Sequence, residues 1–142
     1  VGCGNGVAAV FLSQKYGCNV VGIDSSERMI ALAAQQAEAE GLAHKAEFLV
    51  ADAVNLPFLG STFDTIICEA VFSTLVDKES TAKEFRRVLR SGGKLLILDF
   101  VLRKEVTKEL QSQVSFIPCL ARTRQCCSNL WGQKPRLVAL QG

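Results

Sequence analysis

The chain begins with the stretch Val1-Gly2-Cys3-Gly4-Asn5-Gly6, in which every second residue is a glycine, and an apolar run follows at once. Glycine has no Cβ and adopts positive φ readily, so this stretch can turn sharply and let a ligand approach its backbone N–H groups. We expect a helix over residues 7–15, whose unpaired N–H groups and positive dipole end would face the same ligand. The alternative explanation is a tight turn between two elements.

Short apolar runs and amphipathic segments alternate along the first hundred residues. We expect strands at residues 18–23, 46–51, 63–68 and 94–101, with helices between Ser25 or Ser26 and Gly41 and over residues 78–90. Strands and helices joined by short connections specify a parallel sheet with right-handed crossovers and helices on both faces. The predicted fold is therefore α/β, a Rossmann-like, doubly wound and mostly parallel sheet, with a ligand crevice at the carboxyl ends of its strands.

The two ends of the chain depart from this regular pattern. The glycine stretch needs a strand in front of it, so we expect most of the first strand to be missing, the sheet to be truncated and the chain to be a fragment. Residues 105–113 have the composition of another helix, whereas residues 118–142 contain two prolines and paired cysteines without a clear period. We accordingly divide the chain into a partial domain, residues 1–117, and an irregular C-terminal tail, residues 118–142.

Two aspartates follow predicted strands and would lie beside the glycine stretch. Asp24 comes 18 residues after Gly6, close to the spacing of about 20 at which a carboxylate accepts hydrogen bonds from ribose hydroxyls. Asp52 could accept a hydrogen bond from an exocyclic adenine amino group. The alternatives are that Asp24 caps the next helix, a role that Ser25 could fill instead, and that Asp52 bonds the backbone of its own loop.

Composition and charge describe an ordinary soluble domain. The 142 residues are 49% hydrophobic and 21% charged, with a net charge of +2. The basic residues after position 102 lack interleaved aromatic side chains, which disfavours a nucleic-acid surface. No apolar run approaches the roughly 20 residues that cross a bilayer, and no signal peptide is recognisable. We therefore expect a cytoplasmic protein with neither membrane nor nucleic-acid partners, and the oligomeric state stays open.

The cysteines predict core residues instead of a metal site. The six cysteines, at positions 3, 18, 68, 119, 126 and 127, follow no recurring zinc spacing, and His44 is the single histidine. Cys18 and Cys68 fall within apolar stretches and are expected to be small core residues. Cys126-Cys127 could bind a thiophilic ion or form a vicinal disulfide, but neighbouring cysteines also arise by chance.

Several stretches, taken in their order and spacing, resemble the class I S-adenosylmethionine-dependent methyltransferases. They are Val1-Gly2-Cys3-Gly4-Asn5-Gly6, Val21-Gly22-Ile23-Asp24, Ala51-Asp52-Ala53 before Leu56-Pro57-Phe58, Phe63-Asp64, and Arg87-Val88-Leu89-Arg90-Ser91-Gly92-Gly93. The resemblance covers about residues 1–101. The chain departs from the family in two places, because the acidic residue expected before Val1 is not present and the last two strands are not recognisable after Phe116.

The resemblance implies S-adenosylmethionine as cofactor and a role for each matching position. The glycines would border the methionine part, Asp24 would hold the ribose, Asp52 with Ala53 would hold the adenine, and Cys68 and Glu69 would face the methionine part and the substrate. The implied cofactor-binding set is Gly2, Cys3, Gly4, Gly6, Asp24, Ser25, Asp52, Ala53 and Cys68. Glu69 is a candidate catalytic base, equally well explained as a polar residue at a strand end, and no metal is implied.

The expected function is methyl transfer from S-adenosylmethionine to an unidentified small-molecule acceptor by in-line displacement. Phe72 and Leu75 hint at an apolar acceptor. One alternative is a truncated, non-catalytic remnant of such an enzyme. The other is a nicotinamide-dinucleotide oxidoreductase, which the spacing opposes because its fingerprint requires glycine or alanine where Val7 stands.

Overall fold

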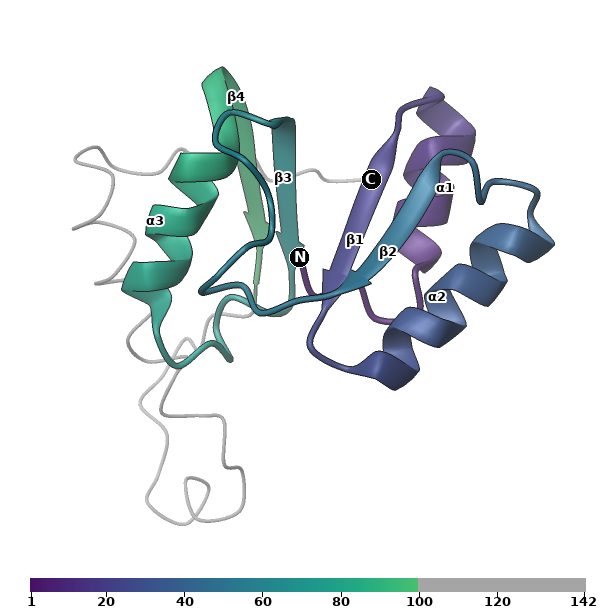
Figure 1. The fold of residues 1–142 in the computed structure, drawn as a ribbon, viewed down its shortest axis with the longest axis horizontal. Coiled ribbons are helices and arrows are strands. Elements are labelled where there is room, and N and C mark those ends of the chain that lie inside the picture. The colour runs from purple at the N-terminus through teal and green to yellow at the C-terminus, as the bar shows by residue number, and fades with distance from the viewer. Residues whose placement is uncertain (100–142) are drawn as a thin grey trace, which may run out of the picture.

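The structure is a computed structural model that describes residues 1–99 (Figure 1). Its elements, in chain order, are α1 (Val7–Tyr16), β1 (Val20–Asp24), α2 (Glu27–Ala39), β2 (Ala46–Val50), β3 (Phe63–Glu69), α3 (Lys78–Val88) and β4 (Leu89–Leu98). This alternation of helices and parallel strands confirms the predicted α/β fold. The helix predicted at 105–113, the tail at 118–142, the domain boundary and the last three cysteines lie outside the described residues.

The strands form two parallel pairs within the described residues. β1 pairs with β2 from Val20 opposite Ala46 to Asp24 opposite Val50, and β3 pairs with β4, ending with Glu69 opposite Leu98. Figure 1 shows the pairs side by side with the N-terminus between them and the carboxyl ends of the strands along one edge.

The first three residues connect these two pairs. The Val1 ammonium donates to the Ile67 carbonyl of β3 at 2.7 Å, and the Cys3 N–H donates to the Ile23 carbonyl of β1 at 2.9 Å. Residues 1–3 therefore run between the two facing strands and are hydrogen-bonded to both. Among the described residues the parallel strands make two separate sheets, in agreement with the predicted truncation of the sheet at its first strand.

Local signals set most helix ends where they were predicted. Gly17 ends α1 in the left-handed conformation, with φ of 68°. Of the two candidate serines, Ser26 caps α2, because its hydroxyl accepts the Met29 N–H at 3.4 Å. The end of α3 differs from the prediction: Leu89 adopts an extended conformation directly after Val88, and β4 therefore begins five residues before the predicted start at residue 94.

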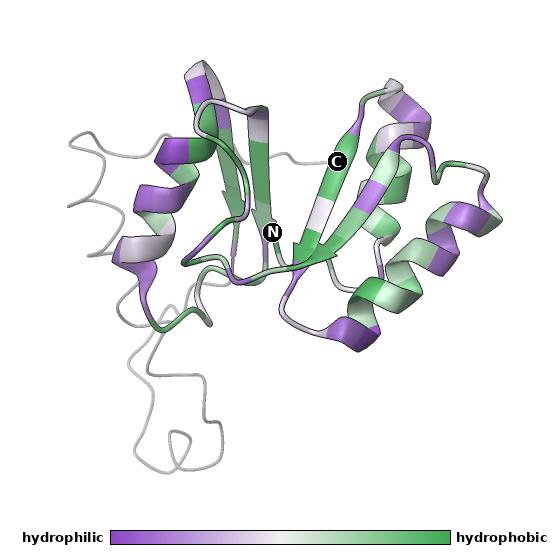
Figure 2. Ribbon diagram, viewed as in Figure 1, coloured by the Kyte–Doolittle hydropathy of each residue, from purple (hydrophilic) through white to green (hydrophobic). Residues whose placement is uncertain are grey.

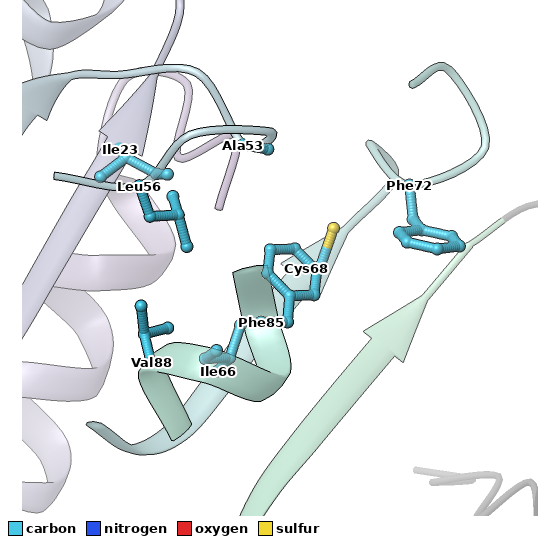
Figure 3. Packing of buried hydrophobic residues seen from close by; sticks show 8 residues of the cluster. All are labelled: Ile23, Ala53, Leu56, Ile66, Cys68, Phe72, Phe85 and Val88. Carbon is cyan, nitrogen blue, oxygen red and sulfur yellow. The ribbon is translucent and has the colours of Figure 1, made fainter. Parts of the chain in front are cut away.

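The main core lies between α3, β3 and the loop that follows β2. Figure 3 shows its buried members, Ile23, Ala53, Leu56, Ile66, Cys68, Phe72, Phe85 and Val88. A smaller cluster of Val10, Ala37 and Ala46 lies between α1, α2 and β2. The hydropathy colouring of Figure 2 shows apolar residues concentrated in the strands and polar ones on the outer faces of the helices.

Two predictions of buried residues are wrong. Cys18 is exposed because β1 begins only at Val20, and the Cys18 thiol donates to the Leu12 carbonyl at 3.5 Å at the surface. The strand predicted at residues 94–101 is almost wholly apolar, which predicts an interior strand, but Leu96 is 38% and Leu98 is 55% exposed. Their side chains alternate with those of Leu95 and Ile97, which pack against the main core, and no described residue buries the opposite face of β4. No helix within residues 1–99 is long and apolar enough to span a membrane.

Candidate functional site

The glycine loop, residues 1–6, makes the predicted sharp turn. Gly2, Gly4 and Gly6 all have positive φ, at 64°, 53° and 82°, and the Gly6 N–H donates to the Cys3 carbonyl at 3.0 Å. A Cβ on Gly6 would lie 2.7 Å from the Ala33 Cβ of α2, so packing as well as conformation requires a glycine there. The loop is thereby held against α2 at the start of α1.

Asp24 joins this loop to the carboxyl end of β1. One carboxylate oxygen accepts the Gly4 N–H at 3.0 Å, and the other accepts the Ser26 N–H at 3.0 Å. Since the hydroxyl of Ser26 caps α2, Asp24 is not the capping side chain of that helix. Each carboxylate oxygen offers two acceptor sites, so both oxygens have capacity for a further donor such as a ribose hydroxyl.

Asp52 lies close to Asp24 because β1 and β2 are in register. Asp24 faces Val50, and its carbonyl accepts the Ala51 N–H at 3.0 Å. Asp52 is exposed, and its Oδ1 accepts the Val54 N–H at 3.1 Å. The local bond considered as an alternative is therefore present, and it occupies one oxygen. We call the glycine loop, Asp24 and Asp52 the rim.

Three further predicted residues border the rim. Ser25 is exposed, next to Asp24, and Cys3 is half-buried. Burial, followed by the nearby Asp24 carboxylate, raises the pKa of the Cys3 thiol. The side chain of Ala53 is only 6% exposed and belongs to the main core, so contact with an adenine would have to come from its backbone.

Cys68 and Glu69 end β3 and differ sharply in exposure. Cys68 is completely buried, which confirms the prediction of a core residue. Desolvation by this burial raises the pKa of its thiol to about 11, so the thiol is neutral at physiological pH. Protein atoms enclose this side chain, and its contact with a cofactor stays a prediction that the burial disfavours. Glu69 is exposed at the carboxyl end of its strand.

The loop after β3 corrects the expectation for the acceptor side. Phe72 is only 2% exposed, and its ring lies 6.4 Å from that of Phe85, measured between centroids. It is a core residue and does not line an open acceptor pocket. Leu75 is half-buried, whereas Val76 is 95% exposed.

Glu84 and Arg87 of α3 together hold the loop after β2, an arrangement that the sequence analysis did not predict. We call this pair the clasp. Glu84 accepts the Leu56 N–H at 2.8 Å, and Arg87 donates to the carbonyls of Leu56 and Phe58 at 2.9 and 2.7 Å. The two side chains also pair with each other at 2.7 Å, and this pairing lowers the pKa of Glu84. The clasp fixes the loop that continues from Asp52. Arg87 opens the Arg87-Val88-Leu89-Arg90 motif, the one sequence signal that pointed to this position.

A concavity of about 330 Å³ lies between Asn5 of the glycine loop and α2. It is lined by Asn5, Leu32, Gln35, Gln36 and Ala39. Neither Asp24 nor Asp52 lines it, so we keep the rim as the candidate site. Within residues 1–99, His, Cys, Asp and Glu side chains form no group of three that could hold a metal ion.

Comparison with known proteins gives the rim its context. The family model described as "Methyltransferase domain" matches residues 1–97. The chain is 37% identical over 103 residues to Methyltransferase GfsG of Streptomyces halstedii, covering 72% of this chain and 37% of that protein. It is 40% identical over 98 residues to the Demethylmenaquinone methyltransferase of Thermus thermophilus, covering 68% of this chain and 44% of that protein.

Solved structures agree with this assignment. The [4+2]-cyclase SpnF is 30% identical with a TM-score of 0.71, over 73% of this chain and 38% of that one. A geranyl diphosphate methyltransferase in complex with GPP and sinefungin is 27% identical with a TM-score of 0.65, over 68% of this chain and 35% of that one. The chain spans less than half the length of each of these relatives. Because the family model covers most of its residues, the chain belongs to the class I S-adenosylmethionine-dependent methyltransferases, whose cofactor is S-adenosylmethionine.

Proposed function

We propose that this chain binds S-adenosylmethionine along the rim and serves methyl transfer to a small-molecule acceptor. The observation that carries the proposal is the 3.0 Å hydrogen bond from the Gly4 N–H to the Asp24 carboxylate. This bond gathers a glycine turn and a carboxylate at the edge where parallel α/β sheets bind their ligands. The strand register adds Asp52 to the same edge.

The start of α1 suits a polar ligand. Among the described residues no side chain caps this helix, and no acidic residue stands in its first turn. In contrast, Ser26 and Asp77 cap α2 and α3. A Cβ built on Gly4 would meet no described atom within 4 Å. The loop therefore has open space beside Gly4, and the N–H groups in the first turn of α1 have no side-chain acceptor among the described residues. Both features favour the binding of a ligand that carries hydrogen-bond acceptors.

In this proposal the residues of the rim orient the reaction. Asp24 accepts hydrogen bonds from the ribose hydroxyls, and Asp52 accepts one from the adenine amino group. When bound, S-adenosylmethionine supplies a methyl group that its positive sulfur already activates, and the bond electrons return to that sulfur. Orientation of the reactants alone can lower a barrier by up to about 7–11 kcal/mol.

A base is required only where the acceptor atom carries a proton at neutral pH. Glu69 is the candidate for this role because its exposed side chain ends β3 at the edge that holds the rim. An acceptor that arrives already deprotonated or as a neutral amine would need no such residue before attack. Replacement of Glu69 by Gln would then leave the pH profile unchanged.

An apolar acceptor is favoured by the loop after β3. Val71 of this loop contacts the glycine loop. Val76, five residues further along the chain, is an apolar residue that is 95% exposed. The Thermus relative is named for demethylmenaquinone and another relative, from Arabidopsis thaliana, for tocopherol. Both names denote largely apolar small molecules, and we extend that substrate class to this chain.

Titration calorimetry with S-adenosylmethionine and with NAD separates this function from its alternatives. The chain and a version extended by a strand before Val1 are both titrated, since residues 1–3 lie between β1 and β3. We expect saturable binding of S-adenosylmethionine and none of NAD. Binding of NAD alone would contradict the proposal. Silence of both versions toward both ligands would favour a non-catalytic remnant.

A further inference from the structure

The loop between β3 and α3 is fastened to the end of β4. The Ala70 N–H donates to the Leu98 carbonyl at 2.7 Å. Directly after Leu98, the Asp99 carboxylate accepts the Ser73 N–H at 2.6 Å and the Ser73 hydroxyl at 2.7 Å. Hydrogen bonds to a carboxylate are stronger than neutral ones. Ser73 is only 2% exposed, so Asp99 satisfies two buried donors at once.

The segment held in this way is a compact turn. The N–H and the hydroxyl of Thr74 both donate to the Val71 carbonyl, at 2.9 and 2.7 Å. Ala70 enters the turn with φ of 53°, a left-handed conformation that a residue with a Cβ adopts at some cost. Surrounding contacts must therefore hold the turn in place, and the two hydrogen bonds from Ser73 to Asp99 join the turn to a residue 26 positions further along the chain.

The turn approaches the rim closely where Val71 meets Gly2. A Cβ built on Gly2 would lie 2.2 Å from Cγ2 of Val71 and 3.0 Å from its other side-chain carbons. The Val71 side chain thus rests directly on the first glycine of the loop. The Asp99 carboxylate is thus connected to Gly2 by a path that runs through its hydrogen bonds to Ser73, the backbone of the turn, and the Val71 side chain.

We propose that Asp99 is a positioning residue that sets the acceptor-side turn against the glycine loop. This inference rests on the proposed function and on the position that the family resemblance implies for Gly2, beside the methionine part of the cofactor, which is its amino-acid part. By fixing Val71, Asp99 determines the space left for that part of the ligand between the two loops. The nucleoside part depends instead on Asp24 and Asp52, which belong to the other strand pair.

This division gives a readout that a merely structural role would not move. Adenosine carries only the groups that Asp24 and Asp52 would bind, whereas S-adenosylhomocysteine also carries the amino-acid part. If Asp99 acts through Val71, Asp99→Ala lowers the affinity for S-adenosylhomocysteine about tenfold and changes that for adenosine less than twofold. General destabilisation would weaken both ligands in parallel.

Graded variants keep the test independent of folding. In Asp99→Asn, the amide oxygen can accept the Ser73 N–H, and the amide NH₂ group can donate to the Ser73 hydroxyl. This variant should therefore bind S-adenosylhomocysteine nearly as tightly as the wild type does. Ser73→Ala removes only one of the two bonds and should lie between, about threefold weaker. If Asp99→Ala does not fold, as judged by circular dichroism, the comparison of Ser73→Ala with Asp99→Asn carries the test.

A double-mutant cycle tests the path itself. In a Val71→Ala background, the additional Asp99→Ala substitution should lower the affinity for S-adenosylhomocysteine by less than twofold, because its effect passes through the missing side chain. Additive losses, parallel losses of both ligands, or no loss at all would overturn the role of Asp99 while leaving the proposed function in place. Failure of the wild type to bind either ligand would overturn both.

Discussion

The described residues form two halves, which differ in what their polar groups contact. The first half consists of α1, β1, α2 and β2, and the second half consists of β3, α3 and β4. In the second half, charged side chains bind protein: Asp77 caps α3, and Glu84 and Arg87 grip the loop after β2. In the first half, and among the described residues, Asp24 and Asp52 accept N–H groups only from residues in or beside the rim, and α1 begins at glycines without a side-chain cap.

This difference separates support from recognition. The second half fixes loops through side chains, and its bonds span many residues along the chain, such as the 2.7 Å bond from Arg87 to the Phe58 carbonyl. The first half presents backbone N–H groups and the carboxylates of Asp24 and Asp52 at one edge. Substitutions of the rim carboxylates in the first half should therefore affect binding, and those in the second half mainly stability, unless they touch the turn that rests on Gly2.

The largest effect on stability is expected at Gly6, where the neighbouring helix α2 leaves no space for a side chain. Gly6→Ala places a Cβ 2.7 Å from the Cβ and 2.9 Å from the Cα of Ala33, at φ of 82°. Overpacking and left-handed strain together should cost roughly 2–5 kcal/mol in urea unfolding. Gly17→Ala is the matched control, since φ is 68° there and no described atom lies within 4 Å. Equal losses in both variants would show that the contact with Ala33 is unimportant.

In the second half, the buried thiol of Cys68 should make the stability of the protein depend on pH in the alkaline range. The pKa of Cys68 is raised from 9.0 to about 11, so the unfolded chain releases this proton first as the pH rises. Stabilisation from the neutral thiol is complete below pH 9 and is lost between 9 and about 11, at about 1.4 kcal/mol per pH unit. The stability difference between wild type and Cys68→Ala should shrink over this range. A constant difference would contradict the burial, and exposed Cys18→Ala serves as control.

A smaller effect should distinguish the clasp from an ordinary surface ion pair. Arg87→Ala removes the donors to the Leu56 and Phe58 carbonyls and should lower the thermal midpoint by several degrees. Lys83→Ala on the same helix breaks only an exposed pair with Glu79, and its midpoint should barely move. Differential scanning calorimetry measures both. If the two variants lose the same amount, the clasp does not support the loop.

Glycines and capping residues made the fold predictable from sequence. Gly6 precedes the first residue of α1, Gly17 follows its last residue, and Ser26 caps α2. Each of these residues acts on backbone groups within a few positions of its own. The same holds for Asp24, whose place after a strand predicted that it would lie beside the glycine loop. Local chemistry of this kind leaves a mark in the sequence.

Contacts between distant residues left no such mark. Arg87 reaches a carbonyl 31 residues away, and Ser73 meets Asp99 across 26 residues. Phe72 looked like a pocket residue because its loop follows a strand end, yet packing against Phe85 buries it. Leu96 and Leu98 looked buried because residues 95–98 at the end of β4 are all apolar, and only the placement of α3 on one face shows which side chains the core covers.

The most direct test of the account is the affinity of Asp24→Ala for S-adenosylhomocysteine, measured by titration calorimetry beside the wild type. Removal of a charged acceptor should weaken binding at least about tenfold, since hydrogen bonds to charged groups contribute roughly 1.5–3 kcal/mol. Asp64→Ala, which removes an exposed carboxylate paired with Arg90, should bind as the wild type does. Unchanged affinity in Asp24→Ala would contradict the claim that the rim holds the nucleoside.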